Sequence, residues 1–415
     1  MTDRSMDAVD PIARSPEIEG SMDAADRDDR SPGIDRPTHR SNRRPADIFD
    51  FVERYVDDYW LYGSGKVALR DVVAAMLPSQ SDRAVCRRRR FGREEPSDRR
   101  WNVLLPAYVP DAVPEPLREL GVEPRYYVIS PELKPSVADV RRRVDGDTIA
   151  IVTIDYFGFP QPARERVASV AREYDCYLVD DNAHATLSVS DGHLLGTRGD
   201  AGVTSLWKTF PVPNGAICYV RNEALRGRFE QSDCSGVRGT LTGADARFVF
   251  TRAIRRALDR RPGLSRRFAS VEERFYGAGV APPAARYEAA KRPCSKLTAV
   301  VCARTDPIAV RDRRRQTYRA WLDACARSTG VRPLFGDLPE GICPQCAPVE
   351  ADRPGRVRNR LTAAGIDVHT WPRLPTLVRE TPTYATAQYL ADHVLALPVD
   401  RRVQPEQVAS VGASL

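Results

Sequence analysis

The feature that most constrains the fold is the run from Thr148 to Ile154, in which β-branched and apolar side chains follow one another without a charged residue. A half-buried strand alternates apolar and polar residues, so this run predicts a strand that is buried on both faces. A helical pattern follows from Pro162 to Tyr174, and a short apolar run from Cys176 to Val179 ends in two aspartates. Strands and helices that alternate at these lengths predict an α/β fold with a mostly parallel, doubly wound sheet.

The composition changes along the chain and predicts three parts. Residues 1–46 are polar, rich in Asp and Arg, and contain a near-repeat, so we expect a disordered low-complexity tail with too little apolar surface to pack. Residues 47–285 carry the alternating elements and predict a large domain. Residues 286–415 repeat a smaller α/β pattern and predict a second, C-terminal domain.

The composition also narrows the class of protein. Hydrophobic residues make up 42% of the 415 residues, which is enough for a large core, but no run of about 18 apolar residues predicts a membrane span. The N-terminus lacks the apolar stretch of a signal peptide, and the nine cysteines form no framework, as is typical of reduced thiols. We therefore expect a cytoplasmic protein.

Arginine accounts for most of the net charge of +7, because the 63 basic residues include only five lysines. Most arginines recur at helical spacing, which is typical of solvated helix faces. The run Arg87 to Arg90 lies in a predicted surface loop from Pro78 to Arg100, without interleaved aromatic residues or a nucleic-acid-binding motif. This pattern predicts a solvated loop and no nucleic-acid partner.

Residues that could bind a ligand or take part in a reaction follow several of the predicted strands. Open α/β sheets bind ligands at the carboxyl ends of such strands. A glycine-containing turn, Gly63 to Lys66, opens an amphipathic helix, and the segment Asp180 to His184 follows a buried strand. Ser205 and Lys208 come next. A phosphate cradle, a carboxylate, a ring and an amine are together what pyridoxal 5′-phosphate (PLP) requires.

The same segments resemble motifs of the DegT/DnrJ/EryC1/StrS family of sugar aminotransferases, which has the type I fold of PLP-dependent transferases. The resemblance extends from about Trp60 to the C-terminus, and its most specific part, Leu178 to Ala185, is similar to the family's V-I-E-D-x-A-Q/H-A. Three shorter motifs accompany it, S-G-T-x-A-L, P-x-Y/F and L-P-V, and they correspond to Ser64 to Leu69, Pro106 to Tyr108, and Leu397 to Val399.

The resemblance implies a role for each site residue. It implies that Asp181 binds the pyridinium nitrogen, that His184 stacks on or edges the ring, and that Lys208 forms the Schiff base. It implies a phosphate site formed by the turn and by a hydroxyl, that is, by Gly65, Lys66 and Ser205. Lys208 also stands out because nearly every other cation is arginine, and a guanidinium group does not lose its proton to act as a nucleophile.

The family also implies a function and a partner. We expect an aminotransferase that moves an amino group, from glutamate in most of the family, to a keto-sugar that is linked to a nucleotide, in polysaccharide or glycan biosynthesis. The resemblance further implies a homodimer with sites at the interface.

Three departures from the family pattern bear on substrate handling. Lys208 stands three residues after Ser205, where the family usually has five, and Pro213 to Ala216 replaces a G-E-G-G stretch. Asp155 occupies the place of the family's strand-end histidine. The shortened loop leaves open a noncatalytic or regulatory protein of the same fold.

Other interpretations of single residues and of the reaction also remain. The alternative for Asp181, which the pattern favours less, is that it caps a helix. Another PLP reaction, such as sugar dehydration, is an alternative, although relatives that dehydrate replace the lysine with histidine. The pair Cys343 and Cys346 has the spacing of half a zinc site, but a second pair is missing, so we expect no metal.

Overall fold

The computed structural model describes residues 44–78, 100–258, 281–371 and 373–412. These residues all fall within one compact unit, His39–Leu415. Most of the predicted tail and most of the predicted loop with Arg87 to Arg90 lie outside the described residues. The predicted domain boundary near residue 285 stays a prediction.

The larger sheet has seven strands in the order β1-β9-β8-β5-β4-β2-β3, and five neighbouring strands in it are parallel. The exceptions are at one edge, where β9 is antiparallel to both β8 and β1. This arrangement confirms the predicted α/β fold with a mostly parallel sheet. The strands are β1 (Trp60–Tyr62), β2 (Asn102–Pro106), β3 (Glu123–Tyr127), β4 (Thr148–Ile154), β5 (Tyr177–Asn182), β8 (Ala201–Ser205) and β9 (Ala216–Val220).

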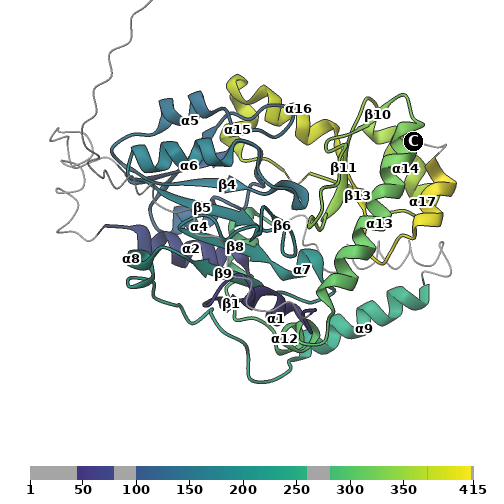
Figure 1. The fold of residues 1–415 in the computed structure, drawn as a ribbon, viewed down its shortest axis with the longest axis horizontal. Helices are drawn as coiled ribbons and strands as arrows, with labels where there is room; N and C mark the ends of the chain where they lie inside the picture. The colour runs from purple at the N-terminus through teal and green to yellow at the C-terminus, as the bar shows by residue number, and fades with distance from the viewer. Residues whose placement is uncertain (1–43, 79–99, 259–280, 372, 413–415) are drawn as a thin grey trace, which may run out of the picture. The chain divides into compact units, whose positions relative to one another are not determined.

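The position of β4 explains its sequence. It lies between β5 and β2, and every one of its residues is buried, as the uninterrupted apolar run predicts. Helix α6 (Arg164–Glu173) packs on β4 and β5, with α5 (Val137–Arg143) beside it (Figure 1). Helix α2 (Gly65–Met76) packs against β8 and β9 through buried apolar side chains.

One predicted helix is shorter than its pattern. The sequence predicts a helix from Asp111 to Leu120, whereas α4 spans only Glu115–Glu119. Pro114 and Pro116 explain the difference, because a residue that precedes proline disfavours the helical conformation, whereas proline itself suits the first turn. The residues before Pro114 therefore form a turn.

A second sheet lies in the C-terminal part and is antiparallel, in the order β10-β11-β13-β12. Helices α13 and α14 pack on this sheet, and α17 packs on α13 (Figure 1). This sheet confirms the predicted C-terminal α/β part. Its strands are β10 (Val331–Pro333), β11 (Cys346–Ala351), β12 (His369–Thr370) and β13 (Val394–Pro398), and its helices are α13 (Pro307–Ala326), α14 (Pro354–Ala363) and α17 (Pro405–Val411).

Most of the remaining elements are short, and α9 (Gly243–Leu258) is the exception with 16 residues. They are the helices α1 (Ile48–Glu53), α7 (Leu206–Thr209), α8 (Glu223–Arg226), α9 (Gly243–Leu258), α11 (Pro283–Glu288), α12 (Lys296–Cys302), α15 (Thr376–Glu380) and α16 (Ala385–His393), the 3₁₀ turns η1 (Tyr156–Gly158) and η2 (Pro382–Tyr384), and the small hairpin β6 (Val189–Ser190) and β7 (His193–Leu194).

Two contacts join the C-terminal part to the loops at the strand ends of the larger sheet. The backbone N–H of Gln345 donates to the carbonyl of Phe157 across 2.8 Å. Gly158 lies beneath the same segment with φ +100°, and a Cβ atom there would lie 2.6 Å from the carbonyl oxygen of Cys343. Only glycine fits this position, so the close approach depends on the absence of a side chain.

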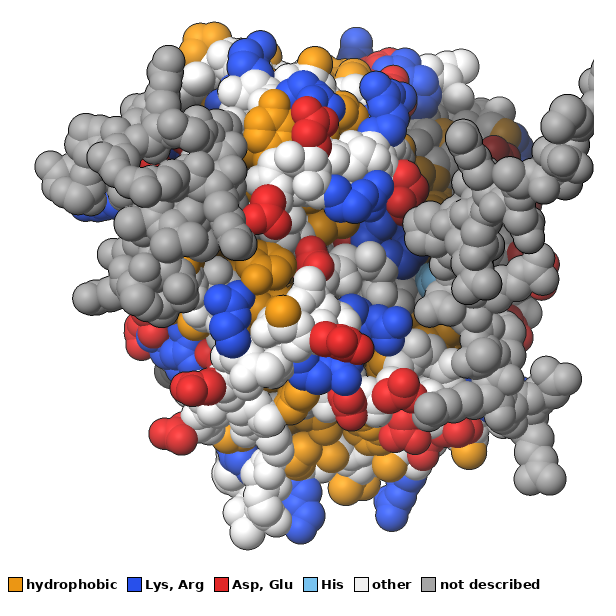
Figure 2. All heavy atoms as spheres, turned by 60° about the vertical axis from the view of Figure 1, so that its left-hand side comes forward, with side chains coloured by type: hydrophobic (Ala, Val, Ile, Leu, Met, Phe, Trp, Pro, Cys, Tyr) orange, Lys and Arg blue, Asp and Glu red, His pale blue; other side chains and the backbone are white. Residues whose placement is uncertain are grey.

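The face that Figure 2 shows has no large patch of positive charge among the described residues. Lys and Arg side chains are interspersed there with Asp and Glu, and hydrophobic side chains form small groups among them. Several arginines are paired with acids, for example Arg125 with Asp145 and Arg141 with Glu173. No helix among the described residues is long and apolar enough to cross a bilayer.

Candidate active site

The parallel strands β2, β4, β5 and β8 end at one edge of the sheet and bring together residues that are far apart in the sequence. Tyr108 follows β2, and Asp155 to Phe157 follow β4. Asp181 lies at the end of β5, with His184 just beyond it. Ser205 closes β8, and Lys208 lies on the single helical turn α7 that follows directly. The candidate site therefore lies at the edge where open α/β sheets bind ligands.

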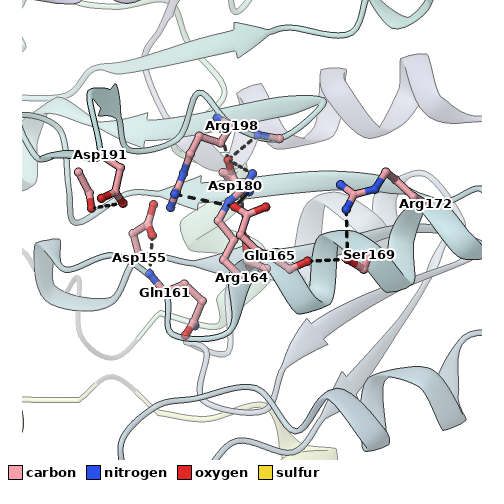
Figure 3. Close-up of polar contacts among 12 residues, drawn as sticks. Asp155, Gln161, Arg164, Glu165, Ser169, Arg172, Asp180, Asp191 and Arg198 are labelled. Carbon is pink, nitrogen blue, oxygen red and sulfur yellow. Dashed lines mark hydrogen bonds and ion pairs between the residues drawn. The ribbon is translucent and has the colours of Figure 1, made fainter. Parts of the chain in front are cut away.

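The two neighbouring aspartates of β5 have different surroundings, because successive side chains of a strand point to opposite faces of the sheet. Asp180 is 2% exposed and forms a two-point ion pair with Arg164 of α6, at 3.1 and 3.0 Å. The Thr153 hydroxyl donates to the same carboxylate (3.0 Å), and so does the backbone N–H of Gly199 (2.6 Å). Figure 3 shows this network around Asp180. Asp180 thus holds β5 against α6.

Asp181 is buried on the other side, and within the described part of the chain its carboxylate accepts a single hydrogen bond, from the backbone N–H of Ala183 at 2.9 Å. Burial raises the pKa of Asp181, while the nearby ammonium of Lys208 and the Ala183 N–H lower it. Asp181 is therefore the aspartate of this pair that faces the amine. The capping interpretation accounts for its contact with Ala183, but no helix begins at this position.

The side chain of Lys208 is partly buried, and its amine lies close enough to Asp181 and Lys66 for both charges to act on it. Burial lowers its pKa, Asp181 acts in the opposite direction, the charge of Lys66 lowers it as well, and the resulting pKa is about 8. An amine with this pKa is partly neutral near pH 8 and is then a nucleophile and a base. The turn α7 achieves this placement despite the short distance from Ser205.

His184 is held in one tautomer. Its Nδ1 accepts a hydrogen bond from the backbone N–H of Phe157 at 3.2 Å, so the ring proton is on Nε2. Burial and the charge of Lys208 lower the pKa of His184 well below its usual value, so the ring is neutral. The ring also lies nearly parallel to that of Phe157, with centroids 5.8 Å apart.

Phe157 itself adopts an unusual backbone conformation, with φ +57° in the left-handed region. For a bulky residue this costs on the order of 1–2 kcal/mol. Both of its backbone polar groups are bonded, the N–H to His184 and the carbonyl to the N–H of Gln345. The strained residue therefore lies between the candidate site and the C-terminal part, as is typical of functional sites.

The start of α2 and the end of β8 meet. Ser64 caps α2 by accepting from the Lys66 N–H, and a Cβ atom on Gly65 would lie 3.3 Å from Oγ of Ser205. Burial and the charge of Arg286 lower the pKa of Lys66. A helix N-terminus, a hydroxyl and an amine side by side are groups that bind phosphate.

The structure thus brings together Gly65 with Ser205, and Lys208 with Asp181, His184 and Lys66. Sequence reasoning missed Trp371, whose ring stacks on Tyr108 with centroids 4.0 Å apart and also contacts His184. No periodicity or motif marks this tryptophan, because it lies just after the two-residue strand β12.

The candidate zinc half-site consists of two buried free cysteines, Cys343 and Cys346. Among the described residues, no group of three or more His, Cys, Asp or Glu side chains is placed to hold a metal ion.

Comparisons with known proteins give a consistent result. Residues 98–247 match the DegT/DnrJ/EryC1/StrS aminotransferase family. A stretch of 80 residues is 31% identical to the uncharacterized protein MJ1066 of Methanocaldococcus jannaschii, and the match spans only about a fifth of each protein, 19% of this chain and 20% of that one.

Similar solved structures cover most of the chain. They include the S. venezuelae protein DesV in complex with a ketimine intermediate, with a TM-score of 0.58 and 15% identity over 88% of this chain and 86% of that one. The aminotransferase TlmJ of Streptoalloteichus hindustanus has a TM-score of 0.58 and 18% identity over 89% and 88%. At these identities the structures establish the fold. The chain therefore has the fold of type I PLP-dependent aminotransferases, and its segment 98–247 is similar to the DegT/DnrJ/EryC1/StrS aminotransferase family.

Proposed function

We propose that the protein is a PLP-dependent aminotransferase that transfers an amino group from glutamate to a keto-sugar linked to a nucleotide. The observation that carries this proposal is the placement of Lys208, an amine with a pKa of about 8, beside the buried Asp181 at the carboxyl edge of the sheet. The similarity of residues 98–247 to the sugar aminotransferase family supports the reaction class. We also propose that it acts in the cytoplasm, in polysaccharide or glycan biosynthesis.

The residues present fit PLP by the chemistry of their donor groups. The start of α2 at Gly65, with Lys66 and the hydroxyl of Ser205, suits the phosphate. Asp181 suits the protonated ring nitrogen, and the neutral ring of His184 suits contact with an aromatic ring. When bound, PLP supplies an electron sink for the pair released from the Cα–H bond of an amino acid.

Asp181 would act by holding a proton on the ring nitrogen. Its carboxylate accepts that N–H while Ala183 keeps its orientation. Burial by itself favours the neutral acid, so the positive charges of the ring and of Lys208 are what keep Asp181 ionised. A hydrogen bond between the Asp181 carboxylate and a protonated ring nitrogen would be charge-assisted and therefore strong.

Lys208 would attach the cofactor and then move a proton. With a pKa of about 8, its Nζ is partly neutral at physiological pH and takes the proton from Cα of the amino donor. The same atom would then act as general acid and donate this proton to the cofactor carbon. Lys66 contributes a charge that keeps the pKa of Lys208 low and a cation at the phosphate end.

We propose that a second copy of the chain covers the region next to Lys208. Trp207 is 53% exposed although its neighbour is the central amine, and Phe250 on α9 is 68% exposed. Exposed apolar side chains of this size are typical of protein interfaces. Light scattering of the purified protein is expected to give twice the monomer mass of 46.3 kDa.

The test is spectroscopic and chemical. Purified protein incubated with PLP is expected to gain a visible band that glutamate bleaches with release of 2-oxoglutarate, and a nucleotide-linked keto-sugar then restores the band. Protein that binds PLP but does not respond to glutamate contradicts the donor. Protein that stays colourless in the presence of PLP supports the noncatalytic alternative.

Sugar dehydration is the other reaction considered. A structurally similar protein is a mutant of the GDP-4-keto-6-deoxymannose-3-dehydratase ColD, with a TM-score of 0.56 and 13% identity over 85% of this chain and 87% of that one. The presence of lysine at 208, where dehydrating relatives carry histidine, favours transamination. Release of ammonia without incorporation of nitrogen into the sugar would favour dehydration instead.

A further inference from the structure

Trp371 brings an aromatic ring from the C-terminal part into the candidate site. It stacks on Tyr108, with ring centroids 4.0 Å apart and an interplanar angle of 13°. Its edge meets Phe157 (5.4 Å) and His184 (5.9 Å), in both cases close to perpendicular. Trp371 thus contacts residues that follow β2, β4 and β5 at once.

Two polar atoms of this cluster, the hydroxyl of Tyr108 and Nε1 of Trp371, are buried and have no hydrogen-bond partner among the residues that the structure describes. Their neighbours are satisfied, since the Tyr156 hydroxyl donates to the carbonyl of Tyr108 (2.8 Å) and Nδ1 of His184 accepts from Phe157. A buried donor without an acceptor is costly, and in native proteins such a group calls for a reason. Here both lie beside the residues assigned to the cofactor.

We propose that Trp371 is a cap that positions the sugar of the acceptor substrate. When a sugar enters, the indole separates from Tyr108, and Nε1 of Trp371 and the Tyr108 hydroxyl donate to oxygens of the sugar. This inference rests on the proposed function, because it assumes that the acceptor lies beside His184 and Lys208.

The chemistry of both rings suits a sugar better than an amino acid donor. A sugar offers several hydroxyl or keto oxygens as acceptors and an apolar C–H face, which packs on an aromatic ring. Neither Tyr108 nor Trp371 carries a positive charge at neutral pH, whereas the two carboxylates of glutamate call for cations. Trp371 therefore acts on the acceptor half of the reaction.

The position of Trp371 in the chain suits a cap. It follows β12, a two-residue edge strand that pairs only with β13, and its backbone is not part of either sheet. A side chain on such a segment moves more easily than the strand-end residues below it. Displacement of the indole would also expose the face of Tyr108, which is fully buried in the structure.

The proposal is tested by measuring how the holoenzyme binds three nucleotide sugars, UDP-glucose, dTDP-glucose and GDP-mannose. The affinity for each is compared with the affinity for the corresponding nucleoside diphosphate. Calorimetry gives the dissociation constants, and tryptophan emission reports movement of the indole. We expect one probe to bind more tightly than its diphosphate and to change the emission. In Trp371→Phe, which keeps a ring but loses the N–H, that probe binds about tenfold more weakly, as expected for one lost hydrogen bond.

Further variants separate positioning from structure. Tyr108→Phe is expected to weaken sugar binding to a similar extent, and the double variant by less than the product of the two effects, because both donors bind one sugar. Binding of the diphosphate changes in none of them. Trp60→Phe is the matched control, since Trp60 packs on Phe229 away from this cluster and its loss leaves both binding and the emission change intact.

The outcomes distinguish this inference from the proposed function. Equal affinity for the tightest probe in Trp371→Phe and in the parent contradicts the role of Trp371, and so does an emission change that persists in that variant. The same holds if none of the three probes binds more tightly than its diphosphate to protein that holds PLP. Failure of the parent protein to bind PLP at all contradicts the proposed function instead. Trp371→Phe retains an aromatic ring, so its result stands even if Trp371→Ala does not fold.

Discussion

The backbone N–H of Phe157 donates to Nδ1 of His184 across 3.2 Å, and this bond decides which nitrogen of the imidazole carries the proton. The bond comes from a residue with a left-handed backbone conformation, which the adjoining Gln345 holds from the other side. His184 therefore presents Nε2–H, with a neutral ring, at the place where the cofactor ring is proposed to lie.

The first prediction concerns this ring. Because burial and the charge of Lys208 lower the pKa of His184 well below its usual value, we expect His184 to stay neutral from pH 8 down to pH 5.5. Nitrogen chemical shifts measured by NMR, assigned with a His184→Asn variant, are expected to show protonated Nε2 and unprotonated Nδ1 throughout. A titration midpoint near 6.5 would contradict the geometry.

The second prediction identifies the lysine that holds the cofactor. After incubation with PLP and reduction with borohydride, peptide mass analysis is expected to find the pyridoxyl group on Lys208, and Lys208→Ala loses it together with transamination. Lys66 is the rival amine, because it lies close enough to Lys208 for its charge to lower the pKa of Lys208. A label on Lys66 would remove the proposed mechanism.

The third prediction is a pH dependence. Only the neutral amine of Lys208 attacks PLP, so the rate of cofactor attachment is expected to rise as the pH increases through about 8 and then to level off. Lys66→Met removes a positive charge that lowers this pKa, so the midpoint moves upward. Lys296→Met is the control, since Lys296 donates to the carbonyl of Gly239 and has no part in the site. An unchanged midpoint in Lys66→Met would show that the two amines do not interact.

The fourth prediction separates the two aspartates of β5. Asp180→Asn removes the buried carboxylate that pairs with Arg164, whose other partner, Glu165, is largely exposed, and we expect a loss of about 3–5 kcal/mol in the free energy of unfolding. Asp181→Asn is expected to keep the fold and to slow the reaction with glutamate by orders of magnitude, because an amide does not hold a proton on the ring nitrogen. Urea unfolding and single-turnover kinetics measure the two effects. If the effects are exchanged, Asp180 is the functional residue.

The fifth prediction concerns Asp155, whose carboxylate accepts the Gln161 N–H at 2.9 Å (Figure 3). Burial and the negative charge of Asp180 raise its pKa to about 7, while Arg164 and Arg198 act in the opposite direction. Its contribution to stability is therefore complete below about pH 4 and is lost as the pH rises through about 7.

Asp155→Asn keeps the hydrogen-bond acceptor and removes the titration. Relative to this variant, the parent protein is expected to lose stability between pH 4 and pH 7, on the order of 1.4 kcal/mol for each unit of raised pKa. Urea unfolding at several pH values measures the difference. Parallel pH profiles for the two proteins would show that Asp155 is ionised at all of these values.

The sequence alone determined the main elements of the larger sheet and the edge at which the site lies. The run Thr148 to Ile154 is apolar at every position because β4 has a neighbouring strand on each side and is buried on both faces. Periodicity reports burial directly, so such elements are readable without coordinates. It failed at Asp111 to Leu120, where Pro114 overrides the helical pattern.

The tertiary structure decided which residues meet. Asp180 and Asp181 are adjacent in the sequence and carry the same side chain. The structure distinguishes them, because Asp180 forms an ion pair with Arg164, whereas Asp181 lies on the opposite face of β5, near Lys208. Tyr108 and Trp371 are joined by packing between distant parts of the chain. Local patterns encode burial and backbone preference, whereas a side-chain contact depends on where the whole fold places two segments. The contacts that carry the new inference therefore appear only in the folded chain.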